Sequence, residues 1–190
     1  MIFKRLEIPE IVICKPEIVN DKRGYFAETF RLDKLQKFIG YNLNFCQDNE
    51  SKSTYGVLRG LHYQVSSNAQ SKLVRVLKGS VLDVVVDLRQ GSPTFGQHIT
   101  VVLSEDNGNQ LLIPRGFAHG FLVLSDEAIF TYKVDNYYCK SSERGIAFDD
   151  EFLKIDWKLD LSEIKISKKD ALNVNFENAD FFNYSVNYYD

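Results

Sequence analysis

An arginine and a histidine stand three residues apart in GVLRGLHYQ, residues 56–64, a stretch that otherwise reads as a buried strand. Imidazole titrates near neutral pH and can move protons, and a guanidinium group suits phosphate oxygens. Residues an odd number apart in a regular strand face opposite sides, so Arg59 and His62 should diverge. Gly60 lies between them, however, and a glycine within a strand often marks a β-bulge. We therefore predict a bulge that turns both side chains to one face. The alternative is an Arg59 that reaches solvent and a hydrogen-bonded core His62.

Two motifs around this stretch resemble those of the cupins. The Gly-x5-His spacing of the first cupin motif ends at His62, and PRGFAH, residues 114–119, resembles the second motif, Pro-x-Gly-x-x-His. This resemblance implies a cupin-type jelly roll. The usual cupin metal ligands are incomplete, because Gln64 stands two residues beyond His62 and no glutamate follows at Asn68 or Ala69. We therefore expect no metal centre.

The flanking sequence narrows the resemblance to one family. Over residues 1–172, in order and without obvious gaps, the chain is similar to the nucleotide-sugar epimerase family of dTDP-4-dehydrorhamnose 3,5-epimerase. The segments that carry the similarity are RGYFAETF, FCQDNESKSTYGVLRGLHYQ, KLVRVLKGSVLDVVVDLRQGSPTFGQ, IPRGFAHGFLVLSDEA, YKVDNYY, ERGIAFDD and ISKKD. GLHYQ alone would be a weak signal, whereas the ordered set is specific. The resemblance implies an isomerase of dTDP-rhamnose biosynthesis that needs no cofactor.

The family's reaction defines what the site must contain. It converts dTDP-4-dehydro-6-deoxyglucose to dTDP-4-dehydrorhamnose by inverting C3 and C5 of the sugar. Each inversion removes a proton next to the ketone and returns one to the opposite face, which requires a base, an opposing acid and a group that stabilises the enolate oxygen. The resemblance assigns these roles to four residues: His62 as base, Asp170 as its orienting partner, Tyr132 as acid and Lys72 at the keto oxygen.

Each of these residues also has a purely structural interpretation. Ser167 and Asp170 have the spacing of a capping box at a helix start. Tyr132 would fit a core or rim aromatic of a strand, and Lys72 a solvated lysine where a strand begins. The family pattern favours the catalytic interpretation. A turn that presents the Asp170 carboxylate to His62 would reconcile both interpretations of that residue.

The same resemblance suggests substrate-binding residues. Arg59 and Arg23 match family arginines, whose guanidinium groups suit the diphosphate. His119 is expected in the same cavity as a polar contact. The nucleobase is expected to be sandwiched and hydrogen-bonded by aromatic and polar side chains, namely Phe26, Glu28, Gln47, Asn49 and Tyr138. Phe26, Gln47 and Asn49 could equally be strand residues that face a neighbour.

Strands are the elements that must position these residues. Short β-branched runs separated by turn residues, as in LVRVLKGSVLDVVVDLRQGSPTFGQHITVVLS, are typical of antiparallel sheets, and Lys78-Gly79 predicts a tight hairpin. A helix is expected over residues 31–39, ending at Gly40, with a turn or two in residues 162–173. We predict one all-β domain over residues 1–190, a cupin-type antiparallel jelly roll with a few short helices.

Composition restricts the partners and the compartment. The 190 residues carry a net charge of −3 with 26% charged residues, so no basic surface favours nucleic acid. The most apolar stretch, VLDVVVDL, is too short to span a membrane, and the N-terminus lacks the apolar core of a signal peptide. Cys14, Cys46 and Cys139 are odd in number and form no C-x-x-C pair, which predicts free thiols. We expect a cytoplasmic protein with a nucleotide-sugar substrate and no nucleic-acid or membrane partner.

The family also implies a homodimer with exchanged N-terminal strands. Residues 10–19, EIVICKPEIV, could form such a strand, and Arg23 and Phe26 would then reach the partner's site. The aromatic tail FFNYSVNYYD is expected to pack on the body or on a partner.

The sequence departs from the family pattern at two places, and it leaves several alternative functions open. Lys158, and the ALN that follows Asp170, stand where the family commonly has proline, which affects the geometry of the C-terminal segment. Relatives with the same core pattern invert one carbon only, or use another nucleotide sugar. A metal-dependent cupin or a non-catalytic sugar-binding cupin is the alternative from another class.

Overall fold

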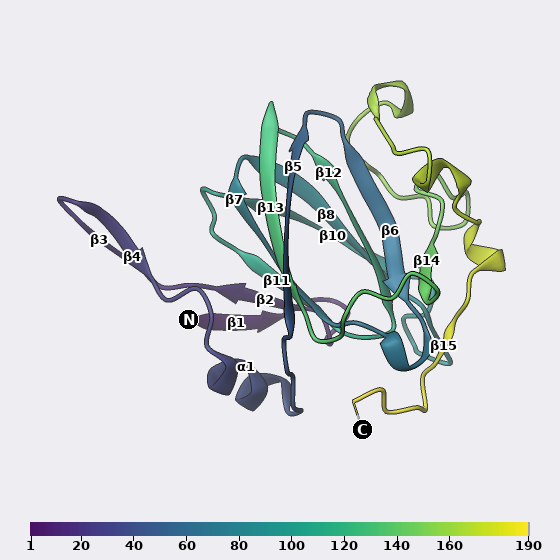
Figure 1. Ribbon diagram of the computed structural model, residues 1–190, viewed down its shortest axis with the longest axis horizontal. Helices are drawn as coiled ribbons and strands as arrows, with labels where there is room; N and C mark the ends of the chain where they lie inside the picture. Colours follow the sequence, from purple (N-terminus) through teal and green to yellow (C-terminus); the bar gives the residue numbers. More distant parts are fainter. Residues whose placement is uncertain (190) are drawn as a thin grey trace.

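The computed structural model describes residues 1–189. Two antiparallel sheets lie face to face (Figure 1). Apolar side chains from both sheets fill the space between them. Val74 and Phe130 come from one sheet and Val85 and Phe121 from the other, and all four are almost fully buried. Each sheet thus presents an apolar face to a shared core. The predicted cupin-type antiparallel jelly roll is confirmed.

The strand order explains how residues far apart in the sequence meet. The larger sheet has the order β1-β2-β11-β7-β13-β5, with strands Ile2–Arg5, Val12–Lys15, Gln110–Ile113, Lys72–Lys78, Glu127–Val134 and Gln47–Thr54. The smaller sheet has the order β10-β8-β12-β6-β14, with strands His98–Ser104, Ser80–Asp87, Phe117–Val123, Leu58–Gln64 and Glu143–Gly145.

The turn at Gly79 is present, but the hairpin predicted there is wrong. β7 ends at Lys78 and β8 begins at Ser80, yet the two strands belong to opposite sheets. β7 pairs with β11 and β13, whereas β8 pairs with β10 and β12. The chain crosses between the layers at this turn, and a tight turn between two β-rich runs does not distinguish a crossing from a pairing.

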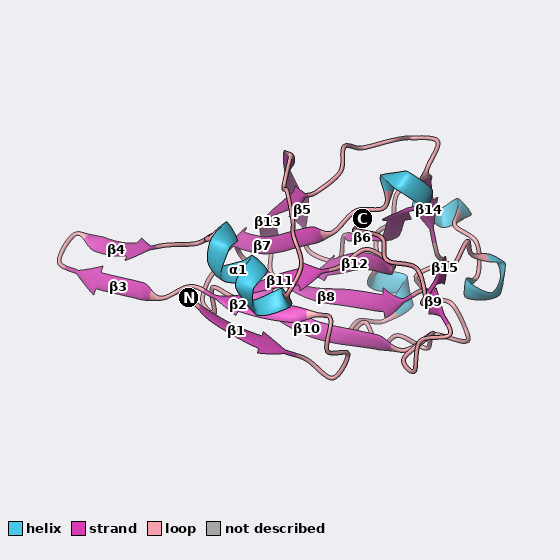
Figure 2. Cartoon of the chain, turned by 90° about the horizontal axis from the view of Figure 1, so that it is seen from below, coloured by secondary structure: helices cyan, strands magenta, loops and turns pink. Residues whose placement is uncertain are grey.

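The N-terminal region has a helix and a projecting hairpin. Strands β3, Ile18–Asp21, and β4, Gly24–Ala27, pair only with each other and extend away from the body (Figures 1 and 2). Helix α1 spans Leu32–Ile39 and ends at Gly40, whose φ of +89° suits glycine and whose N–H donates to the Gln36 carbonyl. The predicted helix is therefore confirmed.

The C-terminal region returns to the body as short 3₁₀ turns and one short strand. Its turns η2, η3 and η4 span Leu161–Glu163, Asp170–Leu172 and Phe176–Asn178, whereas η1, Ser66–Asn68, lies between β6 and β7. Strand β15, Phe182–Asn183, pairs in parallel with β9, Arg89–Gln90. The aromatic tail thus packs on the body, as predicted.

The structure also bears on the predictions about the cysteines and about membrane-spanning segments. Cys14, Cys46 and Cys139 are all free thiols, as predicted. Among residues 1–189, no helix has the length and apolar character to cross a bilayer.

Candidate active site

A cavity of about 600 Å³ opens between the two sheets. Its walls come from β5, β6, β7, β12 and β13 and from residues 165–170. Seven of the side chains that the sequence singled out line it: Asn49, Arg59, His62, Lys72, His119, Tyr132 and Asp170. The structure thus brings together residues that are as much as 121 positions apart, from 49 to 170.

Arg59 and His62 reach this cavity because of the predicted bulge. The pairing of β6 with β12 shifts register by one residue between them, so the odd spacing no longer places them on opposite faces. Gly60 has φ +134°, a conformation that L side chains rarely adopt. A Cβ at Gly60 would also lie 2.5 Å from the Cα of Gly120. Both glycines are needed for this close approach of β6 to β12, and the bulge is confirmed.

His62 is paired with Asp170. The imidazole Nε2 lies 2.6 Å from the Asp170 Oδ1, and the Asp170 side chain is buried whereas 29% of the His62 side chain is exposed. Burial alone would raise the pKa of Asp170, but hydrogen bonds with His62 and Ser167 hold it below its usual value. The Asp170 N–H also donates to the Ser167 hydroxyl at 3.0 Å. The same turn therefore caps itself and presents the carboxylate to the histidine, so the two interpretations of Asp170 are compatible.

Lys72 lies at the floor of the cavity. It is 9% exposed, and its Nζ donates to the His62 carbonyl at 3.2 Å. Burial lowers the pKa of Lys72 to about 8, against the attraction of Asp83 and Glu143. The lysine is therefore not the solvated strand-start residue that the structural interpretation expected, and a buried ammonium is available to a developing negative charge.

Tyr132 faces the cavity from the opposite wall. It lies on β13 of the larger sheet, whereas His62 lies on β6 of the smaller sheet. Burial raises the pKa of Tyr132, although the charge of Arg59 opposes this. The phenol therefore stays protonated at neutral pH and can donate.

His119 and Gln64, the other cupin-motif positions, form hydrogen bonds with other groups of the protein. His119 Nε2 lies 2.9 Å from Asp83 Oδ2, in a fully buried pair whose burial lowers the pKa of His119 and raises that of Asp83. The Gln64 side-chain NH2 donates to the carbonyls of Asn68 and Tyr137, and its oxygen accepts from the Cys139 N–H. Within residues 1–189, no group of three or more His, Cys, Asp or Glu side chains is arranged to hold a metal ion.

Comparison with known proteins identifies the family. The family model described as dTDP-4-dehydrorhamnose 3,5-epimerase matches residues 5–178. The dTDP-4-dehydrorhamnose 3,5-epimerase of Shigella flexneri is 49% identical over 178 residues, which cover 94% of this chain and 97% of that protein. This chain belongs to the dTDP-4-dehydrorhamnose 3,5-epimerase family.

Solved structures of the 3,5-epimerase family share the fold. The dTDP-6-deoxy-D-glucose-3,5-epimerase of Legionella pneumophila, in complex with dTDP-4-keto-L-rhamnose, superposes with a TM-score of 0.92 at 45% identity, covering 97% of this chain and 98% of that one. A 3'-monoepimerase of Streptomyces bikiniensis in complex with dTDP-quinovose has a TM-score of 0.85 at 31% identity, covering 91% and 87%. The family similarity predicted from the ordered motifs is confirmed.

Gln47 and Tyr138, two expected substrate-binding residues of the epimerase family, adjoin the cavity. Gln47 donates to Asn49 Oδ1 at 2.8 Å and accepts from the Tyr138 N–H at 3.2 Å. Arg59, inside the cavity, donates from Nε to the Ser53 hydroxyl at 3.0 Å. The Gln47–Tyr138 contact links the start of β5 to the loop after β13, and the Arg59–Ser53 contact links β6 to β5.

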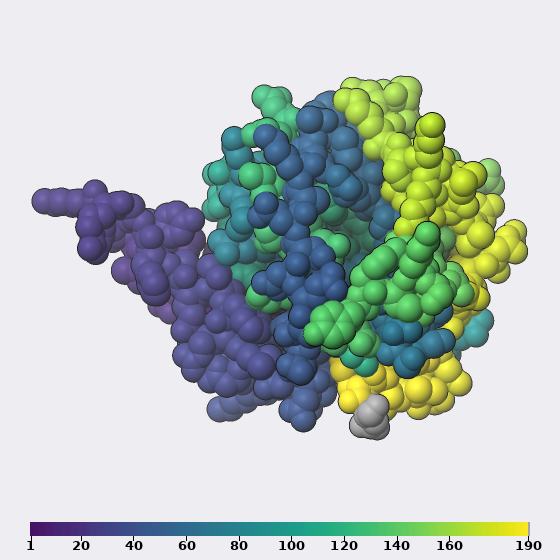
Figure 3. Space-filling view, in the orientation of Figure 1, coloured from purple at the N-terminus to yellow at the C-terminus, as the bar shows by residue number. Residues whose placement is uncertain are grey.

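Three expected binding residues lie outside the cavity of their own chain. Arg23 and Phe26 belong to the β3–β4 hairpin, which projects from the body (Figure 3). The Arg23 side chain is 90% exposed and pairs with Asp21 at 2.5 Å. Phe26 is 72% exposed. Glu28 forms ion pairs with Arg31 and Lys34 beside α1. A single chain does not bring these three residues to His62.

Sequence reasoning missed two charged residues at the cavity rim. Lys169 lines the cavity, and its Nζ lies 2.5 Å from Glu143 Oε1, while Glu143 Oε2 accepts from the Tyr138 hydroxyl at 2.7 Å. Lys169 directly precedes Asp170, and Glu143 begins the quoted ERGIAFDD, but no spacing rule predicts where either side chain points. Only the pairing of β14 with β6 brings Glu143 beside Gln64.

Proposed function

We propose that this chain epimerises C3 and C5 of a dTDP-4-keto-6-deoxy-hexose, converting dTDP-4-dehydro-6-deoxyglucose to dTDP-4-dehydrorhamnose. One observation carries the proposal: the paired His62 shares one cavity with the buried Lys72 and with Tyr132, which both line it from the opposite sheet. The names of the relatives support the same reaction.

His62 is the proposed base. With Asp170 ionised, Nε2–H donates to the carboxylate, so the lone pair that can accept a proton is on Nδ1. The carboxylate fixes this tautomer and stabilises the imidazolium formed when the proton leaves the carbon next to the ketone. The two electrons of the broken C–H bond then move toward the keto oxygen, which becomes an enolate.

Lys72 is the proposed partner of that enolate. At pH 7, a lysine with a pKa of about 8 is still mostly protonated, and its burial strengthens its attraction to the oxygen. Tyr132 then gives its proton to the carbon from the opposite face, which inverts the centre. The resulting phenolate and imidazolium must exchange protons with solvent before the second carbon reacts.

The dTDP moiety is proposed to bind along the rim. Arg59 and Lys169 supply cations for the diphosphate. We further propose a homodimer in which Arg23 and Phe26 complete the partner's site, because these side chains are exposed on a hairpin whose strands, within residues 1–189, pair only with each other. We infer a cytoplasmic location, since all three cysteines are unpaired as in a reducing compartment.

Incubation with dTDP-4-dehydro-6-deoxyglucose in heavy water tests the reaction. We expect deuterium at both C3 and C5 of the product, together with inversion at both carbons. Exchange at one carbon only would instead support the single-carbon alternative, which the similarity to the 3'-monoepimerase makes the strongest competitor. A panel of other 4-keto nucleotide sugars, assayed in parallel, identifies the preferred substrate.

Chelation tests the metal-dependent alternative. We expect turnover to survive EDTA unchanged, because Gln64 stands at the position of the second cupin ligand and the Nε2 atoms of His62 and His119 are each paired with a carboxylate. Loss of turnover that one added metal alone restores would favour a metal-dependent cupin. Binding of the nucleotide sugar without any exchange would favour a non-catalytic one.

A further inference from the structure

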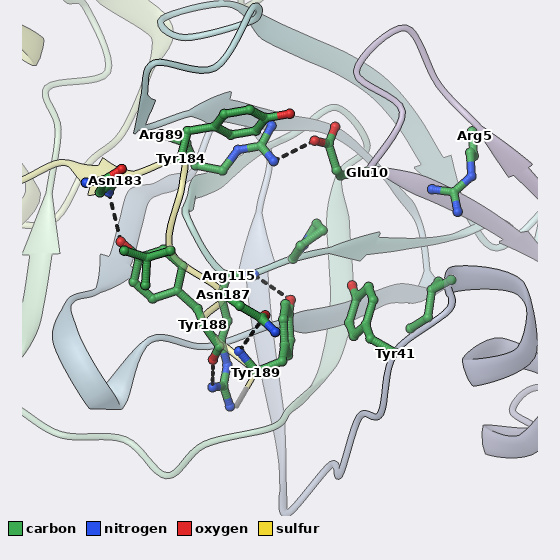
Figure 4. Close-up of a pocket in the computed structure, with 13 residues that line it drawn as sticks. Arg5, Glu10, Tyr41, Arg89, Arg115, Asn183, Tyr184, Asn187, Tyr188 and Tyr189 are labelled. Atoms are coloured by element: carbon green, nitrogen blue, oxygen red, sulfur yellow. Dashed lines mark hydrogen bonds and ion pairs between the residues drawn. The ribbon is translucent and has the colours of Figure 1, made fainter.

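The C-terminal tail is tied to the floor of the site by a set of hydrogen bonds. Residues 182–189 begin with β15, and most of them line a small cavity of about 190 Å³ (Figure 4). This segment lies beyond residue 178, where the match to the family model ends. We call it the C-terminal strap.

Tyr189 makes the decisive contacts of the strap. Its hydroxyl accepts from the Arg115 N–H at 3.0 Å and lies 2.8 Å from the Ser71 hydroxyl. Its ring lies 4.2 Å from the ring of Tyr41, centroid to centroid, and beneath the Arg115 guanidinium (Figure 4). Since the phenol oxygen accepts from Arg115, its own proton is free to be donated to Ser71.

Ser71 connects this contact to Lys72. Ser71 is completely buried, and its N–H donates to Asp135 Oδ1 at 2.6 Å. The other oxygen of Asp135 accepts from Arg115 Nε at 3.1 Å, which closes a ring of four residues around the start of β7. The next residue in the chain is Lys72, the first residue of β7.

We propose that Tyr189 is a positioning residue, which acts through Ser71 to hold the start of β7 so that the Lys72 ammonium stays beside His62. The only hydrogen bond of the Lys72 side chain within residues 1–189 is to the His62 carbonyl, so its place depends on the backbone that carries it. A displacement of about 1 Å at a reacting group can cost about 10²-fold in rate. The inference rests on the proposed role of Lys72 in the reaction.

The test is Tyr189→Phe, which removes the hydroxyl and keeps the ring. We expect kcat to fall about ten-fold with KM within about two-fold of the parent, because the site still binds the nucleotide but Lys72 is less well held. A less firmly buried Lys72 should also titrate at higher pH, so the basic limb of the pH profile should move upward from about 8.

Tyr188→Phe is the matched control. Its hydroxyl accepts from the Asn183 N–H at 2.8 Å within the same strap and does not contact Ser71. This variant should keep the parental kcat and pH profile. An equal loss of activity in both variants would overturn the proposal, since it would indicate a general loosening of the strap.

Two further variants keep the result decisive. Ser71→Ala removes the same hydrogen bond from the other side and should reproduce the Tyr189→Phe phenotype, which matters if the tyrosine variant folds poorly. In a Lys72→Met background, adding Tyr189→Phe should change the residual rate by less than two-fold, because the residue that it positions is gone.

The outcomes separate this inference from the proposed function. Parental activity of Lys72→Met would refute the role of Lys72 and the inference with it. A large loss in Lys72→Met alongside parental activity of Tyr189→Phe and Ser71→Ala would refute the inference alone.

Discussion

The cavity between the sheets and the β3–β4 hairpin hold their candidate site residues in opposite ways. In the cavity, His62, Lys72 and Asp170 are fixed by hydrogen bonds from their own chain. On the hairpin, Arg23 makes one exposed ion pair and Phe26 contacts no core cluster of residues 1–189. This difference agrees with the proposed homodimer, in which one chain assembles the groups that move protons and a second copy completes the recognition of the nucleotide.

The hairpin's exposure supports this division. Val19, Tyr25 and Phe26 are 62%, 68% and 72% exposed, and an isolated two-stranded hairpin is only marginally stable in water. Large exposed apolar side chains gathered on one element commonly mark an interface. An exposed ion pair such as that between Arg23 and Asp21 adds little stability. The hairpin therefore has the properties of a segment that a partner covers.

The largest effect is expected at the base. His62→Ala should abolish both product formation and solvent deuterium exchange, a loss of order 10⁴-fold, because the variant lacks the proposed base. Mass spectrometry of substrate recovered from heavy water measures the exchange. If His62→Ala still incorporates deuterium into the sugar, His62 is not the base that removes the proton.

Tyr132→Phe should have a smaller and different effect. His62, Asp170 and Lys72 remain, so the proton can still leave, but its return to the opposite face is impaired. We expect a loss of about 10²–10³-fold in product, with deuterium appearing in recovered substrate without proportionate inversion. A tyrosine with a purely structural role would give no such separation, and parental turnover would refute its role as the acid.

Much of the cavity could be predicted because local rules determine it. Gly60 between Arg59 and His62 predicted a bulge, and the shifted register of β6 on β12 confirms it. The spacing of Ser167 and Asp170 predicted a capped turn, which the structure has. The His62–Asp170 pairing itself came from the family pattern, because residues 108 positions apart give no local signal.

The remaining features depend on long-range geometry. A turn at Gly79 was evident, but which sheet each flanking strand joins is decided by packing, so the predicted hairpin was wrong. The rim pair of Glu143 and Lys169 depends on where β14 pairs with β6. The Tyr189 contact with Ser71 joins segments 118 residues apart, and composition indicated only that the aromatic tail would be packed.

Mixed dimers test whether Arg23 on the hairpin serves the site of the other chain. Arg23→Ala alone should lower kcat/KM about 10–100-fold, the cost of losing a charge-assisted phosphate contact, and sedimentation should give a dimer. A heterodimer of Arg23→Ala and His62→Ala chains, purified through two different tags, should recover about half of the parental activity. One of its two sites would combine an intact Arg23 with an intact His62 from the other chain.

The heterodimer has a clear opposite outcome. If Arg23 served its own chain's site, both sites of the heterodimer would carry one defect, and no activity would be regained above that of the Arg23→Ala chain. A chain that sediments as a monomer of about 22 kDa at micromolar concentration would also contradict the shared site.

The smallest effect concerns stability, where the two regions should also differ. Lys72 has a pKa of about 8 in the folded chain against 10.5 for an ordinary lysine, so the unfolded chain binds more protons between these values. At pH 7 the buried charge therefore lowers the free energy of unfolding, by at most about 3 kcal/mol, and this cost diminishes as the pH rises from 8 to 10.5. Lys72→Met should raise the free energy of unfolding at pH 7 by about 1 kcal/mol, since part of the gain is offset by the lost hydrogen bond to His62. Urea unfolding at pH 7 and pH 10 should show that the gain in free energy of unfolding from Lys72→Met becomes smaller at the higher pH.

Lys22→Met is the matched control, because Lys22 is an exposed lysine at the hairpin turn. Its free energy of unfolding should stay within about 0.5 kcal/mol of the parent at both pH values. Equal behaviour of the two variants would mean that the cavity does not hold its lysine at the expense of stability.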